Sequence, residues 1–294
     1  MENWPRQIGT CSQLEVVGSL FYGLMFLNQR LSGDEMRSFS FLTESRVLLA
    51  TILGPRLLVV DFNEPSDEES PMHRYICSFN FPNMNIWTSP LHITIRSDPA
   101  PSWTPNPQLQ ALFSHENNDR LFVVTLWTSD GLVVKNVVLF IPASTLLTHL
   151  SHANAVGTDD LLWEAWGPEG TRMLPSLNHS NVWVCYVYGS KFVVSRPPVQ
   201  AGVYPVDVYD FHQLSFRRSF QQTVESSART NTEFVAGGTR ISNTFRKEIR
   251  TCLPYRKRTI YLNNRSEIES VMCNEDNLIF VSVSFSFLFI LAPK

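Results

Sequence analysis

Three carboxylates that lie close together in the chain are the residues best suited to acid–base chemistry. Asp159 and Asp160 are adjacent, and Glu164 follows four positions after the second of them. A glycoside hydrolase needs a pair of carboxylates that face each other across one pocket. Neighbouring acids in a loop more commonly cap turns and face solvent. A glycosidase-like hydrolase is therefore an alternative interpretation, which requires these carboxylates to converge in a pocket with the nearby tryptophans.

The other catalytic signatures are weaker. His149 and His152 would share one face of a helix, but a zinc site needs three or four ligands and no third one has a suitable spacing. The chain has no Gly-x-Ser-x-Gly motif, and the glycines of Gly237-Gly238 lack the spacing of a phosphate-binding loop. We therefore expect no enzymatic activity, no metal and no cofactor.

Two tryptophans suit binding better than catalysis. Trp163 and Trp166 are three positions apart and stand beside Gly167-Pro168. If exposed, such a pair offers a stacking surface for a sugar or a peptide, and tryptophan is a common hot-spot residue. If buried, the same pair fixes a loop onto a sheet, which is the more common arrangement.

A run of basic residues follows later in the chain. Arg256, Lys257 and Arg258 are consecutive, and Arg246-Lys247 and Arg250 precede them. Arginine clusters suit the recognition of phosphate groups on a modified protein, although most charge runs are simply solvated. The candidate contact residues are Trp163, Trp166, Arg172, Arg256, Lys257 and Arg258.

The elements that must position these residues are predicted to be β-hairpins. In the clearest one, the run Leu121–Trp127 precedes Asp130-Gly131, a dipeptide typical of tight turns with positive φ, and the returning strand begins at Leu132 with the runs Leu132–Val134 and Val137–Ile141. Further strands are predicted at 13–28, 39–42, 47–53, 57–62, 75–81, 91–95, 182–188, 191–195, 203–211, 256–262, 270–273 and 278–291. This series predicts an all-β fold, an irregular β-propeller-like array of sequential antiparallel hairpins.

Two segments depart from this pattern. Residues 142–150 predict one short helix, because proline suits a first turn and the leucines that follow form an apolar face. Residues 215–238 predict a long loop or a partly disordered insertion. The endings Asp61-Phe62 and Asp210-Phe211 are alike and favour the propeller-like interpretation, although the Trp-Asp dipeptide of WD repeats is absent.

Composition limits the class of protein. The chain has 294 residues, of which 44% are hydrophobic and 17% charged, which fits a single folded domain over 1–294. A net charge of −3 provides no general attraction to nucleic acid. The five cysteines form no Cys-x-x-Cys pair, which favours reduced thiols in an intracellular protein, cytoplasmic or nuclear. The apolar stretch 278–292 is shorter than a membrane span and alternates like a closing strand, so we expect no membrane partner.

The segment from Leu162 to Arg172 resembles a family signature. It reads Trp-x-x-Trp-Gly-Pro-x-x-Thr-Arg, as in the mushroom-type (basidiomycete) fungal F-box protein family. Other pieces agree in order, and the resemblance extends from about Ser38 to Phe280; they are Phe41–Leu48, Leu57–Asp61, Phe140–Thr145, Val208–Phe211 and Leu253–Arg256.

The resemblance implies the C-terminal, substrate-recognition region of an F-box receptor of a ubiquitin ligase. Its partner would be a protein substrate. An F-box is a short helical bundle, and residues 1–29 do not resemble one, so the chain is expected to be an incomplete member. Binding to the ubiquitin-ligase adaptor is therefore expected only of a longer form that carries an N-terminal F-box. A partial gene product without independent function is a further alternative.

Overall fold

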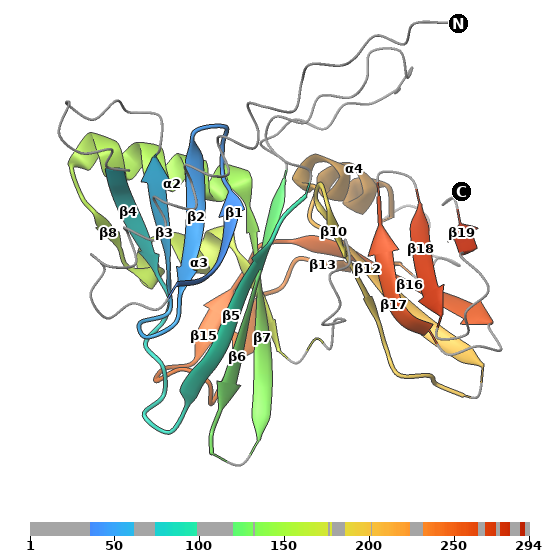
Figure 1. Ribbon diagram of the computed structural model, residues 1–294. Coiled ribbons are helices and arrows are strands. Elements are labelled where there is room, and N and C mark those ends of the chain that lie inside the picture. Colours follow the sequence, from blue (N-terminus) through green and yellow to red (C-terminus); the bar gives the residue numbers. More distant parts are fainter. Residues whose placement is uncertain are drawn as a thin grey trace, which may run out of the picture.

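Antiparallel β-sheets dominate the computed structural model (Figure 1). It describes residues 36–61, 74–98, 120–131, 133–175, 177, 186–200, 202–223, 232–263, 268–274, 277–282 and 289–291. The all-β prediction is confirmed for this part of the chain, where none of the sheets closes into a barrel. The predicted strands at 13–28 lie outside the described residues.

The first two sheets are built mainly from consecutive strands. The β1–β4 sheet contains β1 (Met36–Phe41), β2 (Arg46–Thr51), β3 (Arg56–Asp61) and β4 (Arg74–Asn80), with the short β8 (Asp160–Leu161) parallel to β4 at its edge. The β5–β9 sheet contains β5 (Ser89–Arg96), β6 (Leu121–Ser129), β7 (Val134–Pro142) and β9 (Arg172–Pro175). The predicted hairpins at 47–62 and 121–141 are confirmed.

The turn of the second hairpin shows why the chain uses Asp130-Gly131 there. Gly131 has a φ of 88°, a conformation that costs glycine little. Asp130 Oδ1 accepts a hydrogen bond from the Val133 amide (3.0 Å), and Asp130 Oδ2 forms an ion pair with Lys135 Nζ (2.9 Å). Strand β7 begins at Val134, so the returning strand starts two positions later than predicted from Leu132.

The C-terminal half forms the remaining sheets. The β10–β16 sheet has the order β10 (Val187–Tyr188), β11 (Lys191–Ser195), β12 (Val203–Asp210), β16 (Tyr255–Asn263) and β13 (Thr232–Val235). A hairpin of β14 (Thr239–Ile241) and β15 (Ile249–Thr251) lies beside β9. The β17–β19 sheet contains β17 (Ile268–Cys273), β18 (Leu278–Ser282) and β19 (Phe289–Leu291).

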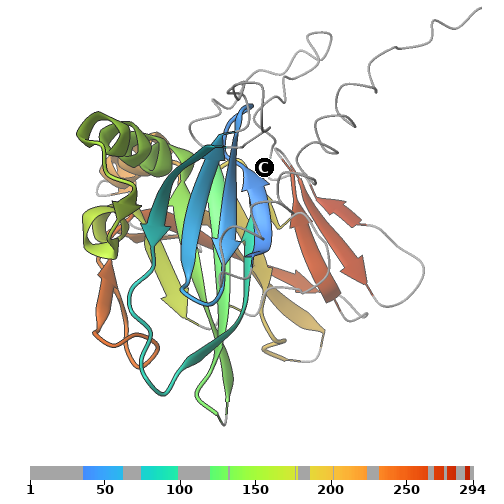
Figure 2. The same cartoon turned by 60° about the vertical axis from the view of Figure 1, so that its left-hand side comes forward.

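The described residues contain three helices, so the prediction of a single short helix was wrong. The predicted one is α2 (Ala143–Val156), which Pro142 precedes and Gly157 ends with a φ of 72°. Helix α3 (Trp163–Gly170) contains the two tryptophans, and both helices pack beside β4 (Figures 1 and 2). Helix α4 (Gln213–Thr223) and β13 occupy much of 215–238, where a loop or a partly disordered insertion was predicted.

The β5–β9 sheet is buried on both faces. Phe122, Val124 and Leu126 point toward the β1–β4 sheet, whereas Leu121 and Val123 point toward the β10–β16 sheet. A strand buried on both faces reads as a continuous apolar run, which explains why β6 does not alternate with polar residues. The β17–β19 sheet contributes buried side chains on the far side of the second cluster, so the sheets follow one another face to face. Within the described ranges, no helix combines the length and the apolar character needed to cross a bilayer.

Candidate functional site

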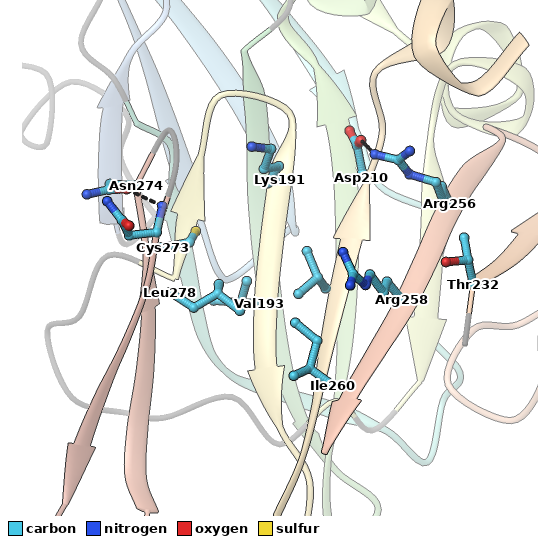
Figure 3. A pocket seen from close by; sticks show the side chains of 12 residues that line it. Lys191, Val193, Asp210, Thr232, Arg256, Arg258, Ile260, Cys273, Asn274 and Leu278 are labelled. Atoms are coloured by element: carbon cyan, nitrogen blue, oxygen red, sulfur yellow. Dashed lines mark hydrogen bonds and ion pairs between the residues drawn. The ribbon is translucent and has the colours of Figure 1, made fainter. Parts of the chain in front are cut away.

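A pocket of about 210 Å³ lies between the β10–β16 sheet and the turn that joins β17 to β18 (Figure 3). One wall comes from the sheet, and Cys273, Asn274, Asn277 and Leu278 form the other. The residues from the sheet are Lys191, Val193, Val208, Asp210, Thr232, Arg256, Arg258 and Ile260.

The strand register explains why these side chains share one wall. Lys191 pairs with Asp210, and Asp210 pairs with Arg256, so the three form a row across β11, β12 and β16. Two positions along, Val208 pairs with Arg258 in the next row. Side chains two positions apart in a strand point to the same face, so both rows line the pocket. Its described lining therefore contains three cationic side chains and one carboxylate.

The Asp210 carboxylate fixes the position of Arg256. Its Oδ2 accepts a hydrogen bond from Arg256 Nη2 at 2.7 Å. Its Oδ1 accepts hydrogen bonds from Ser190 Oγ and the His212 amide, both at 3.0 Å. The Arg256 side chain is still 36% exposed, so its remaining N–H groups stay accessible. A guanidinium held in place in this way loses little conformational freedom when it binds an anion.

Arg258 differs from Arg256 because its side chain forms no hydrogen bond or ion pair with another described residue. Its side chain is exposed and extends from β16, with Asn274 on the opposite wall (Figure 3). Guanidinium groups bind carboxylates and phosphates through two parallel hydrogen bonds. The pocket can therefore accept an anionic group with one fixed and one available arginine.

Lys257, the third residue of the basic run, lies on the other face of the sheet. Its Nζ is 3.2 Å from Asp207 Oδ2 and 5.6 Å above the Tyr209 ring. Arg196 Nε also contacts this buried carboxylate, at 2.9 Å. Lys257 therefore stabilises a buried charge. Contrary to the prediction, it does not share a contact surface with Arg256 and Arg258, because successive side chains of β16 point to opposite faces of the sheet.

Trp163 and Trp166 are buried, with exposures of 3% and 1%. Their ring centroids are 5.1 Å apart, and the Trp166 ring lies 5.2 Å from that of Phe79. Trp166 Nε1 donates a hydrogen bond to the Asn80 carbonyl at 3.2 Å. The pair fixes α3 onto the end of β4, and its burial argues against a stacking surface for ligands.

Arg172 is also buried and belongs to the framework. Its Nε donates to the Leu253 carbonyl at 2.7 Å, and its Nη1 donates to the Gly237 carbonyl at 2.7 Å and to Thr239 Oγ1 at 2.8 Å. Its guanidinium carbon lies 5.0 Å above the Tyr255 ring. Burial lowers the pKa of this guanidinium. Arg172 ties β9 to the segment that carries the β14–β15 hairpin, so it cannot contact a partner directly.

The three carboxylates do not converge. Asp160 accepts a hydrogen bond from Ser78 Oγ, and the backbone carbonyl of Asp159 accepts one from the Tyr75 hydroxyl at 2.9 Å. Glu164 lines a separate hollow with Trp163, and neither Asp159 nor Asp160 is among the residues that line it. The described part of the chain contains no cluster of three metal-binding side chains, and His149 and His152 therefore do not belong to one.

The structure divides the predicted basic run and exposes two apolar residues that sequence reasoning missed. Arg246, Lys247 and Arg250 belong to the β14–β15 hairpin, away from the pocket between the sheets. Ile86 and Trp87 are among the most exposed large apolar side chains of the described residues. The signal available in the sequence was an isoleucine-tryptophan pair inside the loop 82–90, which also contains two prolines and two asparagines.

Comparisons with protein-family models, with curated proteins and with solved structures gave no match for this chain.

Proposed function

We propose that the chain is a non-catalytic recognition module that binds an anionic group of a partner protein in the pocket between the β10–β16 and β17–β19 sheets. The observation that carries the proposal is the pair Arg256 and Arg258. The first is held by Asp210 at 2.7 Å, and the side chain of the second forms no hydrogen bond or ion pair with another described residue. An accessible guanidinium next to a fixed one suits an oxyanion better than it suits a purely structural role.

Phosphoserine or phosphothreonine is the group that best fits the pocket. A phosphorylated side chain carries a charge of about −1.5 to −2 and three acceptor oxygens. Lys191, Arg256 and Arg258 provide ammonium and guanidinium donors on one wall. A volume of about 210 Å³ corresponds to on the order of seven water molecules, so a phosphoryl group and part of its side chain can enter.

The resemblance to fungal F-box proteins gives this module a biological setting. In this proposal the chain is a propeller-like substrate receptor of a ubiquitin ligase. The face-to-face sequence of sheets supports the arrangement. Asp61 and Asp210 support it as well, because each ends the third strand of a run of consecutive strands. Asp61 pairs with Arg46 of the neighbouring strand at 3.1 Å, and Asp210 pairs with Arg256 of its neighbouring strand at 2.7 Å.

Binding of labelled peptides tests the pocket. We expect a pool of phosphoserine peptides to bind more tightly than the same pool with serine, measured by fluorescence anisotropy. Arg258→Ala should weaken this binding about tenfold or more, because a charge-assisted hydrogen bond contributes roughly 1.5–3 kcal/mol. Arg217→Ala is the matched control, since Arg217 is an exposed arginine of α4 outside the pocket.

Two outcomes would contradict the assignment of the pocket. Equal affinity of the phosphorylated and unphosphorylated pools would exclude phosphate as the recognised group. Equal losses in Arg258→Ala and Arg217→Ala would indicate general charge attraction rather than a site.

The ubiquitin-ligase step is tested separately by a pull-down with the adaptor. A longer form that carries an F-box is expected to bind the adaptor, whereas residues 1–294 alone are not. If neither form binds, the F-box part of the proposal fails, although binding of phosphopeptides to the pocket can still be correct.

A further inference from the structure

The connection between β4 and β5 exposes two large apolar side chains next to each other. Ile86 is 78% exposed and Trp87 is 76% exposed. Exposed tryptophan is uncommon on protein surfaces and is enriched among the residues that dominate binding energy at interfaces. This pair, called the Ile86–Trp87 tip below, is separate from the pocket that contains Arg256 and Arg258.

The backbone beneath the tip is fixed by hydrogen bonds to the turn of the β14–β15 hairpin. The Asn85 amide donates to the Thr244 carbonyl at 3.1 Å, and the Arg246 amide donates to the Asn83 carbonyl at 2.8 Å. Within the loop, Asn85 Oδ1 accepts a hydrogen bond from the Trp87 amide at 3.2 Å. Figure 2 shows the connection in teal beside the hairpin in orange. A tip held in one conformation loses little entropy on binding, which favours a recognition role.

The hairpin surrounds the base of the tip with positive charge. Residues 239–251 contain Arg240, Arg246, Lys247 and Arg250 against one carboxylate, Glu248, which already pairs with Arg240 at 3.6 Å. Arg246 and Lys247 are exposed and have no ion pair with another described residue. The local excess of positive charge contrasts with the net charge of −3 of the whole chain. It would attract an acidic surface.

A hollow of about 840 Å³ begins at the root of the same connection. Pro82, Asn83 and Met84 line it, together with the exposed Leu53 and Leu162. The hollow has both polar and apolar lining residues, so a protein segment that contacts the tip could extend into it. A lipid bilayer would contact only the two apolar side chains of the tip, and so small an apolar area gives weak membrane binding.

We propose that the Ile86–Trp87 tip and the basic hairpin turn at Arg246-Lys247 form a docking surface for an acidic segment of a partner protein. This segment carries an apolar side chain flanked by Asp or Glu. The apolar side chain packs against Trp87, and the carboxylates pair with Arg246 and Lys247. The proposal does not depend on the phosphate pocket, because the two sites share no residue.

Three pools of short synthetic peptides test this surface. Each pool has a central Leu or Phe, and the flanking positions hold Asp and Glu, Ser and Gly, or Lys. We expect only the acidic pool to bind, measured by biolayer interferometry. Trp87→Ala should weaken this binding about tenfold or more, as expected for a hot-spot tryptophan. Ile86→Ser should weaken it less, and reversing the charge with Lys247→Glu should also weaken it.

Val199→Ala provides the matched control, because Val199 is 71% exposed in a different loop. Both Trp87 and Val199 are exposed, so all variants should melt at the wild-type temperature. Any of four results would overturn the proposal. The first is equal binding of the three pools, and the second is wild-type affinity of the Trp87→Ala variant. The third is self-association of the chain, measured by sedimentation velocity, that Trp87→Ala abolishes. The fourth is Trp87-dependent binding to phosphatidylserine vesicles with no binding to the peptides.

Discussion

Replacing Arg172 with leucine should destabilise the fold without acting on a binding surface. This guanidinium is buried and is held by carbonyl groups of the segment 237–253. The change leaves the buried acceptors of Leu253 and Thr251 without their arginine donor. It also removes the contact with the Tyr255 ring, whose centroid is 5.0 Å from the guanidinium carbon.

The expected loss of stability follows from these contacts. Each buried acceptor that loses its partner costs about 1–3 kcal/mol, and the cation–π contact contributes roughly 1 kcal/mol. Removing a buried cation returns part of this cost, because burial disfavours its charged form and lowers its pKa. The net destabilisation should be about 3 kcal/mol, a large fraction of the stability of an ordinary domain.

Urea denaturation followed by tryptophan fluorescence measures this effect. With a slope of about 2–3 kcal/mol per molar urea, a loss of about 3 kcal/mol lowers the midpoint by roughly 1–1.5 M. Arg258→Leu is the control, because it removes an exposed arginine whose side chain has no partner in the described part of the chain, and it should change stability by less than about 0.5 kcal/mol. If Arg172→Leu fails to fold, Arg172→Lys retains the charge and should lose about half as much stability.

Equal midpoints for Arg172→Leu and Arg258→Leu would refute the assignment of Arg172 to the framework. Loss of phosphopeptide binding in Arg172→Leu at full stability would refute it as well. The expected pattern is reciprocal, with stability lost in the first variant and phosphopeptide binding lost in the second.

Two further predictions concern packing and pH. Gly167→Ala should lower the thermal midpoint and cost about 1–3 kcal/mol, because a methyl group there would overlap the Trp163 ring; an unchanged midpoint in calorimetry would contradict this packing. Burial raises the pKa of the Cys77 thiol from 9.0 to about 12, with a smaller contribution from Asp159, and burial likewise raises the pKa of the Tyr209 phenol. Because the folded-state pKa of the thiol lies above its unfolded value, the stability that the neutral thiol contributes is fully present below about pH 9. This contribution is lost as the pH rises toward 12. The urea midpoint should therefore fall on the alkaline side, and a midpoint that rises there would contradict the assignment.

The local pattern of the sequence determines much of the β-structure. Alternating and continuous apolar runs locate β2, β3, β6 and β7, because each pattern reflects which faces of a strand are buried. Asp130-Gly131 locates one turn for a local reason, since glycine tolerates a φ of 88°. The Pro142 start of α2 is likewise a local signal. The prediction failed for α3 and α4, where tertiary contacts overrode weak helical signals.

The role of each candidate residue was decided by the tertiary structure. Trp163 and Trp87 are the same residue type, yet one is a buried residue of α3 and the other projects from a loop. Arg258 and Lys257 are neighbours in the sequence, but successive side chains of a strand point to opposite faces. One therefore lines the pocket and the other neutralises Asp207. The sequence by itself determined which residues can bind and which segments form strands. Long-range register and packing decided which of those residues remain accessible, because these depend on contacts between segments far apart in the chain.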